Sequence, residues 1–306
     1  MTSDNKITIL DGGMSRELQR IGAPFRQPEW SALALMETPA LVKAVHKAFI
    51  THGAHVITSN SYALVPFHIG TERFKQHGQA LAARAGEMAR DAVIETGTQS
   101  TTRVAGSIPP LFGSYRADLY EPDRVTEIAG PLIEGLNPYV DVWLCETQSI
   151  IDEAQRVKRL IDQIDTEHKP VWTAFTLIDY EPTPEPLLRS GERVEDAVKA
   201  MADIGIRAIL FNCCVPEAIQ AALRVARKTL QTLPHTGIQT GAYANAFAPQ
   251  AQNAIANEGL SAVRQDLTPI AYRNWAQQWQ SEGASIIGGC CGVGVKHIAE
   301  LAQTFC

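Results

Sequence analysis

The sequence lacks the long hydrophobic run that a membrane-spanning helix requires, because no stretch approaches about 20 consecutive apolar residues. Residues 1–6 contain neither the basic nor the apolar region of a secretory signal peptide. Long basic runs are also missing, and 33 acidic against 27 basic residues give a net charge of −6. We therefore expect a cytoplasmic protein that has neither a membrane nor a nucleic acid as its partner.

Several common site motifs are missing too. The turn Asp11-Gly12-Gly13-Met14 follows an apolar segment but lacks the G-x-G-x-x-G spacing of a dinucleotide-binding loop. The six cysteines include no Cys-x-x-Cys pair, which argues against a thioredoxin-like redox switch. The eight histidines show no spacing typical of metal ligands. These observations disfavour nucleotide binding and simple disulfide exchange.

Three cysteines, in contrast, follow apolar runs closely in the sequence. Cys290 and Cys291 follow residues 284–287 through two glycines, and Cys213 follows residues 208–212. Apolar runs of this length are typical of buried strands, so the thiols lie at predicted strand ends. A chain of 306 residues buries roughly three quarters of its unfolded surface and needs no metal merely to fold. Three sulfur ligands with one open position therefore indicate a catalytic zinc site.

A structural role is the alternative for these cysteines. Free cysteine is often a small buried hydrophobe, and a Gly-Gly-Cys-Cys strand end is also compatible with tight packing. Cys213 and Cys214 are neighbours, and consecutive strand side chains point to opposite faces, so only one of them is expected at the site. Cys145 is interpreted as a core residue and Cys306 as a terminal one.

Short β-type runs alternate with amphipathic helical segments over the whole chain. The eight runs are residues 7–11, 55–59, 103–107, 140–145, 171–176, 208–212, 236–240 and 285–288. The helical segments are residues 39–52, 79–95, 150–164, 194–204, 217–229 and 268–282. This alternation has no linker-like break and predicts an α/β fold, a single (β/α)8 TIM-type barrel domain over residues 1–306. A doubly wound open sheet is the main alternative.

In such a barrel all strands run the same way, so residues at strand ends meet at the carboxyl-terminal mouth. Cys213, Cys290 and Cys291 would then form their zinc site there, although about 75 residues separate the first from the other two. The two longest irregular stretches, residues 107–123 and 177–192, each follow a predicted strand. A barrel places its working loops at those positions.

The chain resembles the homocysteine S-methyltransferase family in the order and strand-end placement of several short motifs. They are Asp11-Gly12-Gly13-Met14 with Glu17-Leu18, Thr58-Ser59-Asn60-Ser61-Tyr62 after strand 2, Glu146-Thr147 after strand 4, Asn212-Cys213, Tyr243-Ala244-Asn245 after strand 7, and Gly288-Gly289-Cys290-Cys291-Gly292 with His297-Ile298. The loop after strand 3 departs from the family, because it reads Pro109-Pro110-Leu111-Phe112-Gly113-Ser114-Tyr115 where Gly-Pro-Tyr-Gly is common. The resemblance favours Cys213 over Cys214 and leaves the methyl donor open.

The resemblance implies that Cys213, Cys290 and Cys291 bind zinc and that the thiol of homocysteine is the fourth ligand. The amino acid end of homocysteine is then expected near the Asp11-Gly12-Gly13 turn and Glu146, with a helix-capping or dipole role as the alternative for either carboxylate. Asn212 and Asn245 are interpreted as substrate contacts or as partners of backbone groups.

Trp30 and Tyr62 are interpreted as aromatic walls for a sulfonium donor, with plain core packing as the alternative. The implied reaction moves a methyl group from S-methylmethionine or S-adenosylmethionine to homocysteine and gives methionine. Alternatives keep the zinc and change the donor, to a corrinoid or betaine-like methyl, or the acceptor, to another thiol or a selenol. A non-enzymatic zinc reservoir or redox sensor is a further alternative.

Overall fold

Eight parallel strands close on one another in the computed structural model, which describes residues 6–181, 185–234, 237–251 and 261–306. The sheet order is β1-β8-β7-β6-β5-β4-β3-β2. The strands are β1 (Thr8–Ile9), β2 (Val56–Thr58), β3 (Arg103–Ile108), β4 (Val142–Gln148), β5 (Val171–Phe175), β6 (Ala208–Asn212), β7 (Gln239–Tyr243) and β8 (Ala284–Ile287). A parallel bridge between Leu10 and Val56 joins β1 to β2 and closes the sheet. The predicted (β/α)8 barrel is confirmed.

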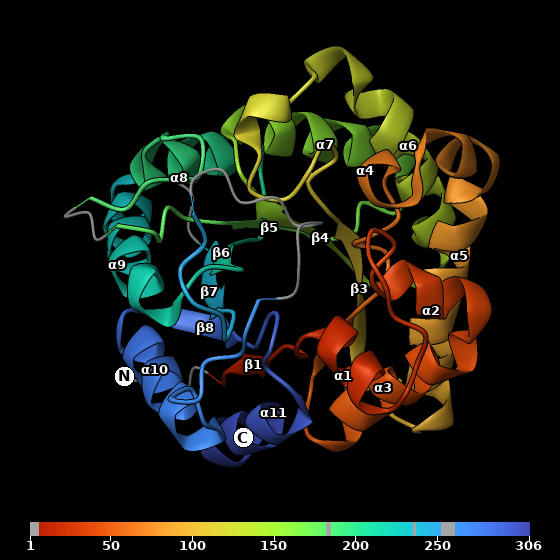
Figure 1. Ribbon diagram of the computed structural model, residues 1–306. Coiled ribbons are helices and arrows are strands. Elements are labelled where there is room, and N and C mark those ends of the chain that lie inside the picture. Colours follow the sequence, from red (N-terminus) through yellow and green to blue (C-terminus); the bar gives the residue numbers. More distant parts are fainter. Residues whose placement is uncertain (1–5, 182–184, 235–236, 252–260) are drawn as a thin grey trace.

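Helices surround the strands in an outer ring, as Figure 1 shows in a view along the barrel. They are α1 (Met14–Arg20), α2 (Ser31–Glu37), α3 (Pro39–Thr51), α4 (Pro66–Ile69), α5 (Thr71–Glu95), α6 (Val125–Leu136), α7 (Ile151–Ile164), α8 (Val194–Asp203), α9 (Pro216–Thr232), α10 (Pro269–Ser281) and α11 (Val295–Phe305). Short 3-10 turns occur at Ala117–Leu119, Pro122–Arg124 and Asn137–Tyr139. The alternation of strands and helices along the chain therefore becomes two concentric layers.

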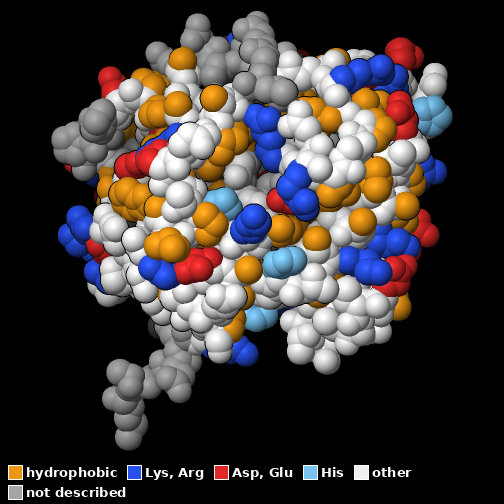
Figure 2. All heavy atoms as spheres, turned by 60° about the horizontal axis from the view of Figure 1, so that its bottom comes forward, with side chains coloured by type: hydrophobic (Ala, Val, Ile, Leu, Met, Phe, Trp, Pro, Cys, Tyr) orange, Lys and Arg blue, Asp and Glu red, His pale blue; other side chains and the backbone are white. Residues whose placement is uncertain are grey.

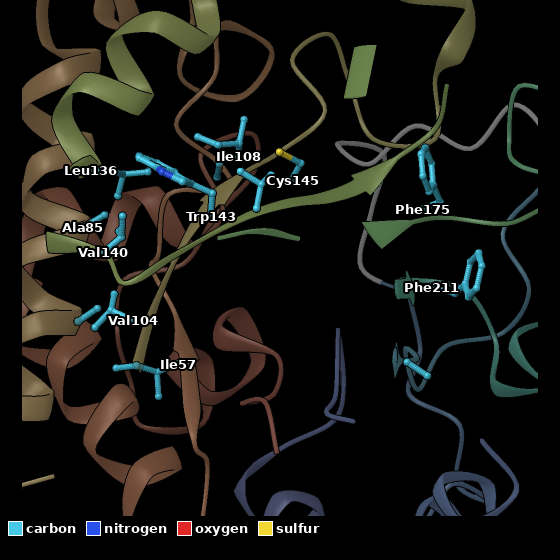
Figure 3. Close-up of a cluster of buried hydrophobic side chains, with 14 of the residues drawn as sticks. Ile57, Ala85, Val104, Ile108, Leu136, Val140, Trp143, Cys145, Phe175 and Phe211 are labelled. Carbon is cyan, nitrogen blue, oxygen red and sulfur yellow. The ribbon is translucent and has the colours of Figure 1, made fainter. Parts of the chain in front are cut away.

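The alternation of side chains in β4 shows how the barrel divides its apolar residues. Val142 and Leu144 point to the barrel interior, whereas Trp143 and Cys145 pack against the surrounding helices. Figure 3 shows Trp143 and Cys145 within this outer cluster, and the Trp143 indole N–H also donates to Asp165 at 2.9 Å. Both faces of the strands are therefore buried, which explains why their sequences read as continuous apolar runs.

Several predicted boundaries were wrong, most clearly in α5, β4 and β7. Helix α5 begins at Thr71 and not at residue 79, because its first turns are mostly exposed and carry little apolar periodicity. Strand β4 continues past Cys145 to Gln148, and β7 runs over Gln239–Tyr243 instead of 236–240, with residue 236 outside the described residues. Part of the predicted irregular stretch 177–192, residues 182–184, also lies outside the described residues.

The described helices include none long and apolar enough to cross a membrane. Lys and Arg side chains lie among Asp and Glu side chains over the face that Figure 2 shows, so charge of either sign is dispersed there.

Candidate metal centre and substrate cavity

Three thiols meet at the carboxyl-terminal mouth of the barrel. The Sγ atoms of Cys213, just after β6, and of Cys290 and Cys291, after β8, all lie within 4.8 Å of one another. Strand β7 lies between β6 and β8 and anchors both turns through its end: Tyr243 O accepts from Cys213 N at 3.3 Å, and Ala244 O accepts from Cys290 N at 2.9 Å. The thiols are therefore held by backbone hydrogen bonds of the barrel itself.

Glycines allow the first turn of the chain to pack against this thiol turn. A Cβ atom on Gly13 would lie only 2.7 Å from the carbonyl oxygen of Cys290, so no larger residue fits without movement. The Gly13 N–H donates to Val293 O at 2.9 Å, which ties the two turns together. Gly292 has a φ of +82°, a conformation that glycine adopts without strain. The Gly-Gly and Gly-Cys-Cys-Gly motifs are thus two sides of one contact.

The thiol cluster fits a zinc ion. Tetrahedral zinc with Zn–S bonds of about 2.3 Å separates its sulfur ligands by about 3.8 Å, and the observed limit of 4.8 Å is compatible with that spacing. Thiolates are soft ligands that select zinc over hard cations such as magnesium. Cys213, Cys290 and Cys291 would hold the ion and leave one position open. Zinc bound in this way would take a substrate thiol there and keep it ionised at neutral pH.

The other three cysteines lie away from this cluster. Cys214 and Cys145 are fully buried in the apolar layer between strands and helices, and Cys306 is exposed at the end of α11. The adjacent pair therefore divides as expected, with Cys213 lining the cavity and Cys214 in the core, in a bend after β6 where Cys213 has a φ of +52°.

Asp11, two residues after β1, is buried beside the thiols. Its carboxylate accepts from the Thr58 N–H at 2.7 Å and from the Thr58 hydroxyl at 3.0 Å. Burial raises the pKa of Asp11 to about 8, against the lowering effect of the two Thr58 hydrogen bonds. Both contacts leave the carboxylate without a cation to balance its charge.

Glu146, in β4, is the second buried carboxylate near the thiols. Its carboxylate accepts from the Ser107 hydroxyl at 2.5 Å and from the Tyr243 hydroxyl at 3.3 Å. Burial is again the main cause that raises its pKa, to about 7, while these two hydrogen bonds act in the opposite direction. Within the described residues no Lys or Arg forms an ion pair with Asp11 or Glu146. Two buried carboxylates are thus available to a cationic ligand group.

A cavity of about 580 Å³ connects these groups. Asp11, Gly12, Gly13, Glu146 and all three cluster cysteines line it. Trp30 and Tyr62 line it as well, so both predicted aromatic residues face the cavity. A second cavity, of about 640 Å³, lies between α5 and α6 and has no cysteine or histidine in its lining. Only the first cavity combines thiols with buried carboxylates.

Asn212 and Asn245 are placed differently from the other predicted substrate contacts. The Asn212 side chain exchanges hydrogen bonds with Thr147, accepting from its N–H at 3.0 Å and donating to its hydroxyl at 2.9 Å. The Asn245 carbonyl accepts from Phe247 N at 3.1 Å. Neither residue is among those that line the cavity. Their contacts correspond to the second of the two roles considered, in which they satisfy backbone groups and shape the loops.

Sequence reasoning missed several groups in this region. Thr58, Ser107 and Tyr243 supply the hydroxyls that hold the two carboxylates, yet none has a spacing that marks it. Arg16 lines the cavity from α1, and its guanidinium lies 5.6 Å from the centre of the Phe247 ring. Tyr115, from the loop after β3, places its hydroxyl 3.0 Å from Cys213 Sγ. Position near a strand end was an available signal for the first three, and Thr58 and Tyr243 also stand in the family motifs, although no role had been assigned to them.

Comparison with known proteins places the geometry in a family. The chain is 28% identical to a homocysteine S-methyltransferase of Escherichia coli (strain K12), with 96% of this chain and 94% of that protein covered. It is 25% identical to a selenocysteine Se-methyltransferase of Brassica oleracea var. italica, covering 92% and 84%. The metallated structure of the homocysteine methyltransferase MmuM from Escherichia coli superposes with a TM-score of 0.77, 27% identity and 99% and 97% coverage. The model of the homocysteine S-methyltransferase family matches residues 8–305, and the chain therefore belongs to that family.

Proposed function

We propose that this protein is a zinc-dependent enzyme that transfers a methyl group from a sulfonium donor, S-methylmethionine or S-adenosylmethionine, to homocysteine and forms methionine. One observation carries the proposal: three mutually close thiols share a cavity with two buried carboxylates that form no ion pair with a Lys or Arg of the described residues. The thiols suit a metal that binds a substrate sulfur. The carboxylates suit the ammonium group of an amino acid. Family membership and an amino acid thiol as acceptor agree with both features.

The carboxylates would orient the acceptor. Asp11, in the turn after β1, and Glu146, in β4, would receive the ammonium group of homocysteine, which would ionise both of them. The Gly13 N–H already donates to Val293 O, so we assign the substrate carboxylate to the Gly12 N–H of the same turn. Anchoring one end of the amino acid in this way directs its sulfur toward the cysteine cluster. Binding energy at the amino acid end therefore aligns the reacting atom.

The methyl donor would enter along the aromatic part of the cavity. Trp30, Tyr62 and Phe247 line it, and aromatic faces attract a sulfonium cation. In the reaction the bond from the donor sulfur to the methyl group breaks as a bond to the acceptor sulfur forms. The donor becomes a neutral thioether and the acceptor thiolate loses its charge, so no proton moves and no general acid is needed. A cavity that excludes water favours this loss of charge.

Arg16 would select donors that carry a carboxylate. It is the one Lys or Arg among the described residues that line the cavity, and it is held by hydrogen bonds to Ser261 O at 2.6 Å and to the Gln19 side chain at 3.0 Å. A guanidinium group at a cavity wall binds carboxylates well because its N–H groups match the two oxygens. S-Methylmethionine and S-adenosylmethionine both offer such a group.

The test combines metal analysis with methyl-transfer assays. Wild-type protein is expected to bind about one zinc per chain, and to form methionine from homocysteine and S-methylmethionine or S-adenosylmethionine. Cys213→Ser, Cys290→Ser and Cys291→Ser should each lose or strongly weaken both properties. Cys214→Ala is the matched control, since its side chain lies in the apolar core. Full zinc retention in all three variants would refute the ligand assignment, and activity only with a methylated corrinoid protein would refute the sulfonium donor.

A selenol is the second acceptor to consider, because one relative is a selenocysteine Se-methyltransferase. The same carboxylates and thiols suit selenocysteine, whose side chain is one methylene shorter than that of homocysteine. Competition between homocysteine and selenocysteine at equal concentrations decides the matter. A higher kcat/KM for the selenol would replace homocysteine in the proposal without changing the assigned residues.

A further inference from the structure

Tyr115 touches the thiol cluster from the opposite side of the barrel mouth. It belongs to the loop after β3 and has a φ of +68°, a strained backbone conformation for a residue with a side chain. Its hydroxyl lies 3.0 Å from Cys213 Sγ and 3.2 Å from Cys213 O. No other hydroxyl contacts a cluster sulfur among the hydrogen bonds of the described residues. The strained backbone of Tyr115 therefore places its phenol in contact with the sulfur of Cys213.

A buried ion pair holds the Tyr115 ring in place. The Arg189 guanidinium lies 4.8 Å from the ring centre, and Arg189 pairs with Asp179 at 2.8 Å. The two charged side chains are 1% and 0% exposed. Burying two charges is costly, and an apolar pair of similar size would serve packing equally well. The methyl transfer described above assigns no role to either residue.

The partners of this ion pair connect it to the cysteine turn. Asp179 accepts from Val215 N at 3.1 Å, two residues beyond Cys213. Arg189 donates to Gln250 O at 3.0 Å in the segment after β7. The planar guanidinium is thus fixed by Asp179 from the loop after β5 and by a carbonyl after β7, and Asp179 is held in turn from the loop after β6. Tyr115 from the loop after β3 stacks on the guanidinium. Because Asp179 binds the turn that carries Cys213, the arrangement fixes the position of the phenol relative to the Cys213 sulfur.

We propose that Tyr115 is a positioning residue that donates a hydrogen bond to the Cys213 thiolate when the cluster holds a metal, with Arg189 keeping its ring in register. This inference rests on the proposed zinc function and deepens it. A phenol has one proton, and a metal-bound thiolate has none, so the proton of this contact comes from Tyr115. The hydrogen bond makes Cys213 a weaker electron donor than Cys290 and Cys291 and restricts its sulfur to one position. Groups outside the ligand shell commonly tune metal sites in this manner.

Cobalt(II) in place of zinc gives a readout that does not depend on methyl transfer. Tyr115→Phe keeps the ring and its stacking and removes only the hydroxyl. We expect the sulfur-to-cobalt charge-transfer band to move to lower energy, because a thiolate without a hydrogen bond donates more readily. Zinc affinity, measured by competition with a chelator, should fall about tenfold as the sulfur loses its fixed position. Tyr62→Phe is the matched control, since the Tyr62 hydroxyl contacts Ser114 at 2.7 Å and no sulfur.

The outcomes separate this inference from the proposed function. A wild-type protein that binds no zinc or cobalt overturns both. A wild-type protein that binds metal, with an unchanged band and affinity in folded Tyr115→Phe, overturns the role of Tyr115 alone. Arg189→Lys is the second variant, and it keeps a charge for Asp179 while it removes the planar group under the ring. It should shift the band in the same direction and by less. If Tyr115→Phe does not fold, an unshifted band in Arg189→Lys overturns the proposal.

Discussion

The cavity wall has two halves of different chemistry and different construction. The thiol half, made of Cys213, Cys290 and Cys291, is fixed by backbone hydrogen bonds and by close approaches that need glycine. The carboxylate half, made of Asp11 and Glu146, is fixed by side-chain hydroxyls from other strands. The first kind of construction restricts residue types at neighbouring positions and leaves a motif. The second spreads its requirements over the sequence.

The difference also assigns different tasks to the halves. Soft sulfur ligands suit a metal and a substrate thiol, whereas buried carboxylates suit an ammonium group. If this division is correct, the two halves can be disabled separately. A variant of the carboxylate half should lose amino acid binding and keep zinc, which is the opposite of the cysteine variants.

Glu146→Gln should show the largest effect on the carboxylate half. The glutamine carbonyl can still accept from Ser107, and its NH₂ group can donate to the Tyr243 hydroxyl, so the local structure is kept. What is lost is the charge that receives the substrate ammonium. A charge-assisted hydrogen bond contributes about 1.5–3 kcal/mol, which corresponds to a rise in the KM for homocysteine of roughly 10- to 150-fold. Steady-state kinetics measures the change.

Zinc content is the matched measurement for Glu146→Gln. It should equal that of the wild type, because Glu146 belongs to the carboxylate half and is not one of the three thiols that form the cluster. Loss of zinc together with substrate affinity would show that the two halves are not independent.

The motifs of the thiol half were sufficient to predict its geometry from the sequence. Parallel strands end at the same mouth, so Cys213 and Cys290 had to meet once the barrel was assumed. The choice between Cys213 and Cys214 needed the resemblance as well, because strand alternation predicts that one faces outward without saying which. The barrel itself followed from the alternation of apolar runs and amphipathic segments.

In the carboxylate half the resemblance pointed to Asp11 and Glu146, but the residues that hold them were not predicted, for a physical reason. Glu146 and Tyr243 were expected just after their strands, yet β4 and β7 extend to include them. Their polarity is satisfied by long-range partners such as Ser107, which local patterns do not reveal. Tyr115 is a similar case, because its contact with Cys213 depends on a positive φ in a loop that departs from the family pattern.

Release of protons when an amino acid binds is a smaller expected effect that tests the carboxylate half. In the ligand-free protein the pKa values of Asp11 and Glu146 are raised to about 8 and about 7, so both carry protons to a large extent at neutral pH. A bound ammonium group favours the ionised forms and expels those protons. Methionine is a suitable ligand because it has no thiol proton of its own. Calorimetry in buffers of different ionisation enthalpy should show release of about one proton at pH 7.

The sign of this linkage fixes the pH dependence. Methionine affinity should rise as the pH increases from about 5 to 8, because less proton displacement is then required. For the same reason these raised pKa values favour the ligand-free fold at low pH, and that contribution is lost as the pH rises through the folded-state values. Release should be smaller in Glu146→Gln. Equal release by this variant and the wild type would indicate that Glu146 is already ionised in the free protein.

Arg16→Gln should show the smallest change in kinetic constants. Arg16 lines the side of the cavity where we place the methyl donor. The half-buried guanidinium is partly solvated, so we expect only a few-fold rise in the KM for S-methylmethionine, with the KM for homocysteine unchanged. Trimethylsulfonium has the same reactive centre and no carboxylate, and its kcat/KM should be equal in the variant and the wild type. Equal losses with both donors would mean that Arg16 supports the cavity through its contacts with Ser261 and Phe247 and does not read the donor. A loss confined to S-methylmethionine would show that the cavity wall has a third part. Arg16 would then bind the amino acid end of the donor, whereas the carboxylate half binds the amino acid end of the acceptor.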